Sequence, residues 1–423
     1  MPHPFLILMG KSVRYAARLR GGGSALPGLF VEKIDPDFIK NTLAPLPHGI
    51  VVVSGTNGKT TTTKMVVSLL ERQGLKVFTN RTGSNFTRGV AAALLKDVDM
   101  KGQLDADIAV LELDEAHAVK FVETIPPRYS LLLNVMRDQL DRFGEIDATA
   151  RMLTKIAQAT SDTVVLNRED PRIRLIPTVL AGQHVTYFGL DDSLLSHFPS
   201  DDDMRNTNLK STKRPAADVT LSAYEGTNAT YTIDANPHTI SLKLNGIYNV
   251  YNSAAALAIT RAIMAKRFDT NKALASLAEV TPAFGRGEAL MIGGQPLELV
   301  LVKNPSGFRL GLQSFDPTGY TTMIAINDNY ADGRDMSWLW DVEFASLQPG
   351  GVSTVSGVRA YDMALRLQYD EVAIEAVETE LTVALRSFIA KHPNKPKRIY
   401  CTYTAMLALR KELSKMTNVE VIA

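Results

Sequence analysis

Residues 50–70 read IVVVSGTNGKTTTTKMVVSLL, and the rest of the chain is interpreted outward from this stretch. The apolar, β-branched run at its start is typical of a buried strand, and apolar residues return at helical spacing after Lys64. A glycine-rich loop separates the two. Such a loop and the helix N-terminus behind it both favour an anion, so the stretch predicts a nucleotide site. The residues expected to contact the nucleotide are Gly55, Thr56, Asn57, Gly58, Lys59, Thr60 and Thr61.

Two side chains of this loop are expected to act on ATP directly. Lys59 would neutralise phosphate charge, and the Thr60 hydroxyl would bind Mg²⁺. The usual phosphate-loop motif has a glycine five residues before Gly58, where this chain has Val53. The alternative is a tight glycine turn with an incidental lysine, which would bind no nucleotide.

Composition excludes several other classes of protein. Lys and Arg total 46 against 45 Asp and Glu, so the net charge of +1 gives no reason to expect nucleic-acid binding. The single cysteine, Cys401, excludes an intrachain disulfide and a cysteine-rich zinc site, and no structural zinc is expected. No apolar run approaches the roughly 18 residues of a membrane span. A cytoplasmic protein is the default expectation.

The chain is too long for one ordinary core, and its pattern predicts an α/β fold in two sheet domains. We expect an N-terminal helical segment at 1–48, a central ATP-binding domain with a parallel sheet at 49–282, and a smaller C-terminal α/β domain at 283–423. A polar insertion is expected at about 191–240. The expected strands after the first are Ile108–Leu113, Ser130–Leu133, Thr163–Leu166, Val219–Ala223, Ala229–Ile233, Leu297–Val302, Met323–Ile326, Gly351–Val355 and Arg398–Cys401, and a long helix is expected around Asn252–Lys266.

The N-terminal segment carries a basic helix with two possible roles. Lys11, Arg14, Arg18 and Arg20 accompany a short apolar cluster within the first 20 residues. Such a helix can lie on an anionic membrane surface, which would place the protein at the inner face of the plasma membrane. The alternative is that it packs on its own protein and leaves its charges in solvent.

Glu112 is the most unusual polar residue of the central domain. It ends the apolar run 108–111, where a carboxylate is costly to bury unless it is paired or binds a metal ion. The alternative is a strand residue that faces the surface. Asp114 and Glu115 follow closely and could line the same rim.

Three segments resemble the Mur ligase family, which includes the folylpolyglutamate synthases. They are the loop GTNGKTT at 55–61, the segment NVMRDQLDRFG at 134–144, and the segment GIYNVYNSAAA at 246–256. Enzymes of this family use ATP to activate a carboxylate as an acyl phosphate and then form an amide. The resemblance therefore implies ATP and Mg²⁺ as cofactors.

The resemblance also implies roles for single residues. Glu112 would be a Mg²⁺ ligand together with Thr60, and Asn249 and Asn252 would contact the adenine edge. Capping of a helix by Asn249 alone is the alternative for that residue. In the sequence GRGE at 285–288, Arg286 would bind the nucleotide phosphates through its planar guanidinium group.

The chain departs from the family pattern at three places. Gln139 replaces the histidine of a second Mg²⁺ site, and Leu153 stands near the position of the lysine that many members carbamylate. A neutral amide is a poor substitute for imidazole, so one Mg²⁺ site is expected. Val300 occupies the position of an acidic residue whose role must be missing or supplied by another group.

The segment IAINDNYADGRDMSWLWD at 324–341 narrows the resemblance. It holds four aspartates, two asparagines and both tryptophans directly after an expected strand, which indicates a site or an interface. It resembles the MurT-type subunits of lipid II isoglutaminyl synthase, a branch of the Mur ligases. Those subunits amidate the α-carboxylate of D-glutamate in the stem peptide of lipid II, with ammonia from a separate glutaminase, GatD.

This resemblance implies a heterodimer whose substrate, lipid II, lies at the membrane surface. Asp335 would complete the glutaminase by orienting its catalytic histidine, and capping of an Asp-Gly turn is the alternative. Two other functions stay open: an amino-acid-adding Mur ligase or folylpolyglutamate synthase-like ligase, and a binding protein with a vestigial nucleotide site.

Overall fold

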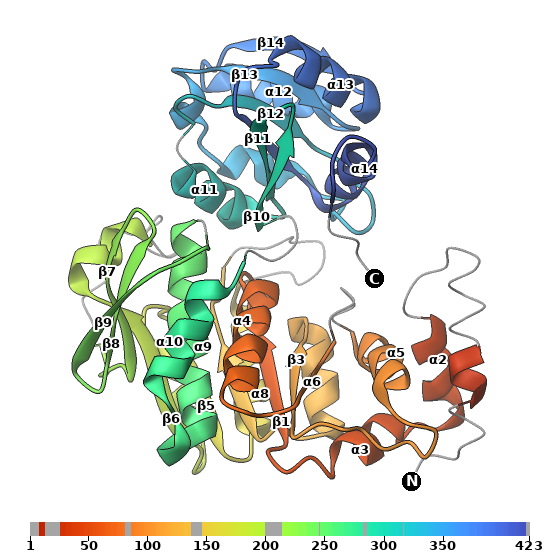
Figure 1. The fold of residues 1–423 in the computed structure, drawn as a ribbon, viewed down its shortest axis with the longest axis vertical. Helices are drawn as coiled ribbons and strands as arrows, with labels where there is room; N and C mark the ends of the chain where they lie inside the picture. The colour runs from red at the N-terminus through yellow and green to blue at the C-terminus, as the bar shows by residue number, and fades with distance from the viewer. Residues whose placement is uncertain are drawn as a thin grey trace.

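The computed structural model describes residues 8–12, 26–80, 86–136, 146–198, 214–244, 246–281, 286–315 and 317–419. Within these residues the chain forms two sheets covered by helices, a nine-stranded one and a six-stranded one. In Figure 1 the smaller, C-terminal domain, in blue, lies above the larger domain, which runs from red to green. The predicted α/β fold is confirmed.

The large sheet has the order β2-β3-β1-β4-β5-β6-β7-β8-β9. Its strands are parallel from β2 to β7, and β8 and β9 add as antiparallel neighbours. Strand β1 lies between β3 and β4, so the chain leaves β1 toward one edge of the sheet and leaves β4 toward the other. Ligands of α/β sheets bind where the order reverses in this way. The strands are β1 Ile50–Ser54, β2 Val77–Thr79, β3 Ile108–Glu112, β4 Tyr129–Leu132, β5 Thr163–Asn167, β6 His184–Leu190, β7 Val219–Glu225, β8 Asn228–Ile233 and β9 Asn236–Ser241.

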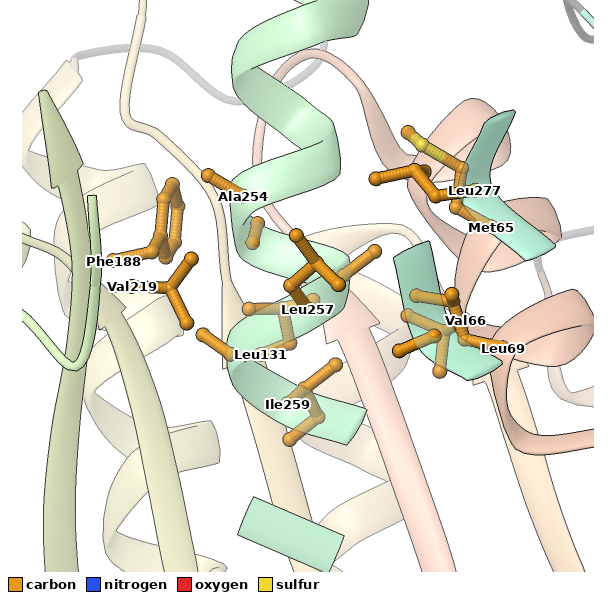
Figure 2. Packing of buried hydrophobic residues seen from close by; sticks show 14 of the residues in the cluster. Met65, Val66, Leu69, Leu131, Phe188, Val219, Ala254, Leu257, Ile259 and Leu277 are labelled. Carbon is orange, nitrogen blue, oxygen red and sulfur yellow. The ribbon is translucent and has the colours of Figure 1, made fainter. Parts of the chain in front are cut away.

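Helices cover both faces of this sheet. Strand β1 is apolar because its side chains are buried on both faces. Val51 and Val53 join one buried cluster, whereas Ile50 and Val52 join the other. Figure 2 shows the first cluster, where side chains of α4, α9 and α10 pack together on the sheet. The helices are α2 Leu26–Ile34, α3 Phe38–Leu43, α4 Lys59–Arg72, α5 Thr87–Asp97, α6 Glu115–Thr124, α8 Ile146–Ala159, α9 Ile247–Met264 and α10 Thr270–Glu279, with 3-10 helices η1 Ile173–Val179, η2 Asp192–His197 and η3 Ala265–Arg267.

The small sheet has the order β10-β11-β15-β12-β13-β14, parallel except for the β10–β11 hairpin. The strands are β10 Arg286–Ile292, β11 Gln295–Leu301, β12 Thr321–Ala325, β13 Val352–Ser356, β14 Ile374–Glu378 and β15 Lys397–Cys401. The helices are α11 Pro305–Ser314, α12 Ala360–Tyr369, α13 Leu381–Lys391 and α14 Tyr403–Leu413, with 3-10 helices η4 Ser337–Asp341 and η5 Ala345–Leu347.

All ten strands expected from the sequence are present, and β2, β6, β9, β10 and β14 are additional. Strand β14 was not expected because it lies at an edge of its sheet, where its side chains are mostly exposed and form no apolar run. Strand β9 reads NPHTIS, which is poor in β-forming residues. The polar insertion expected at about 191–240 overlaps β7, β8 and β9, which continue the large sheet, and its residues 199–213 lie outside the described residues.

Little of the basic N-terminal segment is described. In residues 8–12, Lys11 donates a hydrogen bond through Nζ to Val98 O at 2.7 Å, and Gly10 lies against Leu95. This short part packs on its own protein, whereas Arg14, Arg18 and Arg20 lie outside the described residues. None of the described helices combines the length and the apolar character needed to cross a membrane.

Candidate functional site

The glycine loop lies at the carboxyl end of β1, where the strand order reverses. Gly55 and Gly58 both have positive φ, at +133° and +88°, a region that favours glycine. A Cβ atom on Gly55 would lie 2.9 Å from the backbone nitrogen of Asn134, and one on Gly58 would lie 2.6 Å from Nδ2 of Asn252. Glycine is therefore required at both positions.

The segment after β4 fixes the shape of this loop. The backbone N–H of Asn57 donates to Asn134 Oδ1 at 2.9 Å, and Asn134 Nδ2 donates to Asn57 O at 3.0 Å. The N–H of Thr56 donates to Asn134 O at 3.0 Å, and the N–H of Met136 donates to Thr56 Oγ1 at 3.0 Å. From the sequence, Asn134 is part of a motif without a role of its own; in the structure its hydrogen bonds fix the backbone of the loop.

Lys59 lies folded back over the loop. Its side chain is 7% exposed, and Nζ lies 2.6 Å from Gly55 O and 3.4 Å from Thr56 O. Nζ is also 3.6 Å from Oε1 of Glu115, whose side chain is 2% exposed. A buried ammonium group thus has a buried carboxylate as its counter-ion.

The two predicted Mg²⁺ ligands lie in contact. The Thr60 hydroxyl donates to Glu112 Oε1 at 2.7 Å, so the half-buried Glu112 side chain points to the start of α4 and not to the surface. Asn80, at the end of β2, pairs with the Glu112 backbone through Nδ2 to O at 2.8 Å and N–H to Oδ1 at 3.0 Å. Asn80 was missed, although its place directly after a strand could have suggested it.

Several buried polar atoms around the loop have no hydrogen-bond partner among the described residues. They include Thr61 Oγ1, Asp114 Oδ1 and Glu115 Oε2, each in a side chain that is almost fully buried. Buried polar atoms are nearly always satisfied, so these atoms fit a site that a polar ligand completes. Within the described part of the chain, no group of three or more His, Cys, Asp or Glu side chains could hold a metal ion.

The start of α9 adjoins the loop. Asn252 packs against Gly58, and Asn249 lies one turn earlier, half-buried. Gly246 is the N-cap of α9, and Asn249 is the third residue of the helix. Arg286 opens β10, but its side chain and residues 137–145, which include Gln139, lie outside the described parts.

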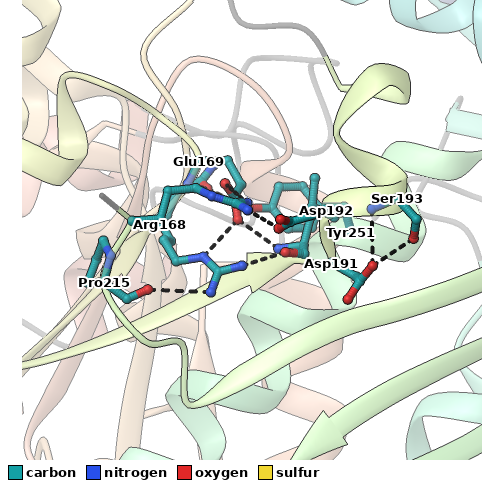
Figure 3. A network of polar contacts seen from close by, with 10 residues as sticks. Arg168, Glu169, Asp191, Asp192, Ser193, Pro215 and Tyr251 are labelled. Carbon is teal, nitrogen blue, oxygen red and sulfur yellow. Dashed lines mark hydrogen bonds and ion pairs between the residues drawn. The ribbon is translucent and has the colours of Figure 1, made fainter. Parts of the chain in front are cut away.

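A network of polar contacts lies at the ends of β5 and β6, next to the glycine loop (Figure 3). Arg168 pairs with Glu169 at 2.9 Å, and Arg214 pairs with the same carboxylate at 3.0 Å. The Tyr251 hydroxyl of α9 donates to Asn167 Oδ1, and Asn167 Nδ2 donates to Leu133 O at 2.7 Å. These contacts connect α9, β5 and the end of β4 into one support for the loop.

Asp170 is hydrogen-bonded to the segment that follows β4. Its Oδ2 accepts from Val135 N at 2.6 Å, and its Oδ1 accepts from the N–H groups of Arg172 and Ile173 at 2.9 and 3.0 Å. Burial raises the pKa of Asp170 to about 6, although the hydrogen bond from Val135 and the others oppose the rise.

The acidic segment of the C-terminal domain follows β12. Asp332 is buried, accepts from the N–H of Thr404 at 2.7 Å, and has its pKa raised by that burial. Asp328 pairs with Arg359, the N-cap residue of α12, at 2.8 Å. Asp335 Oδ1 accepts from Ser337 N at 2.9 Å, so the turn-capping contact that was the alternative for Asp335 is present. Asp335 is half-buried and thus keeps part of its surface toward solvent.

An apolar stripe lies beside this segment. Tyr361, Leu365 and Tyr369 repeat every four residues along α12, and the two tyrosines are 71% and 70% exposed. Trp340 of η4 stacks edge-on against Tyr369 with ring centroids 5.0 Å apart. We call these four side chains the α12 stripe. Exposed apolar groups gathered in this way mark an interaction surface.

Two family models match the chain. One described as the Mur ligase middle domain matches residues 53–260, and one described as MurT ligase C-terminal matches residues 301–406. The chain is 33% identical, over 96% of its own length and 96% of the relative's, to the MurT subunit of lipid II isoglutaminyl synthase (glutamine-hydrolyzing) from Streptococcus pneumoniae.

Solved structures share the fold at low identity. MurF from Acinetobacter baumannii superposes with a TM-score of 0.70 at 16% identity, covering 92% of this chain and 80% of that one. MurF from Thermotoga maritima in complex with ADP gives 0.66 at 17% identity, covering 90% and 84%. At such identities the likeness shows the fold alone.

Proposed function

The chain belongs to the Mur ligase family, in the branch of the MurT subunits of lipid II isoglutaminyl synthase, and on this premise we propose that it amidates lipid II with ATP. The product would be D-isoglutamine, formed at the α-carboxylate of D-glutamate in the stem peptide. The observation that carries the proposal is the glycine loop itself, where Thr60 is hydrogen-bonded to Glu112 and Lys59 is paired with Glu115. This arrangement offers a cation and oxygen ligands where phosphate groups would lie.

ATP would bind with its phosphates in the loop 55–61. Asn249 and Asn252 would contact the adenine edge, and Arg286 would bind the phosphates. Lys59 would exchange Glu115 and the carbonyl oxygens of Gly55 and Thr56 for phosphate oxygens, whose negative charge it would neutralise. The unpartnered Thr61 hydroxyl supports a ligand at this place.

Thr60 and Glu112 would hold a Mg²⁺ ion. Both present oxygen atoms, which this ion prefers, and their contact at 2.7 Å brings them close enough to share it. A bound Mg²⁺ would neutralise phosphate charge. A single carboxylate leaves the remaining positions to phosphate and water oxygens, as is usual for Mg²⁺.

The reaction needs no side-chain nucleophile. A carboxylate oxygen of the substrate would attack the γ-phosphorus, so that an O–P bond forms to give an acyl phosphate while the bond to ADP breaks. Ammonia would then attack the acyl carbon, the C–N bond would form, and phosphate and a proton would leave. Lys59 would offset the negative charge that builds up on the transferred group. Cys401 is unsuited to nucleophilic attack because it is buried, which raises the pKa of its thiol.

Ammonia would come from a GatD-type glutaminase subunit. The C-terminal domain offers a surface for it, since the α12 stripe is apolar and exposed and the Asp328–Arg359 ion pair ties the acidic segment to α12. Asp335 would lie at this surface and orient the catalytic histidine of the glutaminase. The apolar stripe and the half-buried carboxylate support this arrangement together.

The test is an amidation assay on the chain copurified with its glutaminase. ADP release and isoglutamine formation should both depend on lipid II and on glutamine or an ammonium salt. Lys59→Ala should abolish both activities, whereas Lys76→Ala, which alters an exposed ion pair, should not. ADP release that requires a free amino acid instead would identify an amino-acid-adding ligase, and wild-type protein without ATP turnover would refute the proposal.

A further inference from the structure

Helix α11 of the C-terminal domain begins at a buried asparagine. Asn304 is 0% exposed and is the N-cap of α11, where its Oδ1 accepts from Gly307 N at 2.7 Å. Phe308 and Leu312 of the same helix are buried in the core of the C-terminal domain. The helix therefore moves with that domain as one body.

The same asparagine contacts the glycine loop of the other domain. Asn304 Nδ2 donates to Asn57 Oδ1 at 3.2 Å, a contact between residues 247 positions apart. The backbone of Asn57 is held at the same time by Asn134. Asn57 is thus held from both sides, by the large sheet through Asn134 and by the C-terminal domain through Asn304.

The far end of α11 lies against α9. A Cβ atom built on Gly246, the N-cap of α9, would lie 3.5 Å from Cβ of Ser314 and 3.6 Å from Cζ of Phe315. Figure 1 shows α11 at the edge of the C-terminal domain that faces α9. One helix thus contacts both flanks of the proposed nucleotide site, the loop at its N-terminus and the start of α9 at its C-terminus.

We propose that Asn304 is a positioning residue that couples the glycine loop to the C-terminal domain. The hydrogen bond from Asn304 fixes the Asn57 side chain, so docking of α11 adds a restraint to the one that Asn134 places on the loop backbone. This coupling rests on the proposed function, because it assumes that the loop binds ATP. It also gives the domain that would carry the glutaminase a direct influence on the ATP site.

Two substitutions separate this role from helix capping. Asn304→Ser keeps an oxygen that caps α11, because serine is a good N-cap residue, but its side chain is too short to reach Asn57. Asn304→Ala removes both interactions. Asn394→Ser, at an exposed position of the same domain, is the matched control.

The first measurement is hydrogen exchange of the nucleotide-free complex of the full chain with its glutaminase. Peptides that cover residues 55–58 should exchange about five times faster in both Asn304 variants than in the wild type, because a lost hydrogen bond of this kind changes an equilibrium by about that factor. The second measurement is the dissociation constant of ADP with Mg²⁺, which should rise by a similar factor in both variants. The melting temperature should fall in both variants, and it should fall further in Asn304→Ala, which also loses the helix cap.

Each result decides the matter. If Asn304→Ser behaves like the wild type and only Asn304→Ala changes, Asn304 only caps α11 and the coupling is refuted. If both variants exchange faster in residues 55–58 while Asn394→Ser does not, the coupling is supported. Wild-type protein that fails to bind ADP would overturn the proposed nucleotide site and, with it, this role.

Discussion

Replacing Glu115 by glutamine tests whether the folded-back position of Lys59 depends on its counter-ion. The two charged groups are 3.6 Å apart and almost fully buried. At an effective dielectric constant of about 20, their gross attraction is about 5 kcal/mol. Most of it is offset by the cost of burying Glu115, which the substitution also removes. Lys59 keeps the carbonyl oxygens of Gly55 and Thr56, so we expect a net loss of about 1–2 kcal/mol in the free energy of unfolding.

The assay is urea unfolding of the complex with and without saturating Mg²⁺ and ADP. Without nucleotide, Glu115→Gln should be less stable than the wild type by the stated amount. With nucleotide, phosphate oxygens would replace the lost counter-ion of Lys59, and the difference should shrink. Glu123→Gln, an exposed position on the same helix, should show no difference in either condition. An equal deficit with and without nucleotide would refute the idea that Lys59 exchanges Glu115 for phosphate.

Four further outcomes are expected. Glu112→Gln should abolish ATP turnover and weaken its Mg²⁺ dependence at unchanged thermal stability, and normal turnover would remove Glu112 from the site. Asp335→Asn should suppress amidation driven by glutamine but leave amidation driven by ammonium salt intact, whereas equal loss with both would assign Asp335 to folding or to the ligase step. Elemental analysis should find no stoichiometric zinc, because one cysteine cannot build a cysteine-rich site, and about one zinc per chain would reveal a missed ligand set. Asp170 has a raised pKa in the folded protein, so its stabilising contribution is present below about pH 4 and is lost as the pH rises through about 6. In urea unfolding, Asp170→Asn should therefore remove roughly 2–3 kcal/mol of the pH dependence of stability, and an unchanged dependence would contradict the raised pKa of Asp170.

The glycine loop and most strands could be predicted because their signals are local. Gly55 and Gly58 occupy backbone conformations that other residues avoid, and the apolar run at Ile50–Ser54 reflects a strand buried on both faces. Strands at an edge, such as β14, lack that second buried face and therefore leave a weaker signal.

The sequence alone determined the α/β class, the glycine loop and the residue types that suit phosphate and Mg²⁺, because backbone preference and burial act on neighbouring residues. Only the tertiary structure decided which side chains meet at the loop. Asn134 and Glu115 reach it because β1 lies between β3 and β4, and Asn80 reaches Glu112 because β2 lies beside β3; no local pattern encodes this order. Asn304 reaches it from a different domain, 247 residues further along the chain. Such contacts depend on the order of the strands in the sheet and on the docking of the two domains. Both are set by the packing of the whole chain.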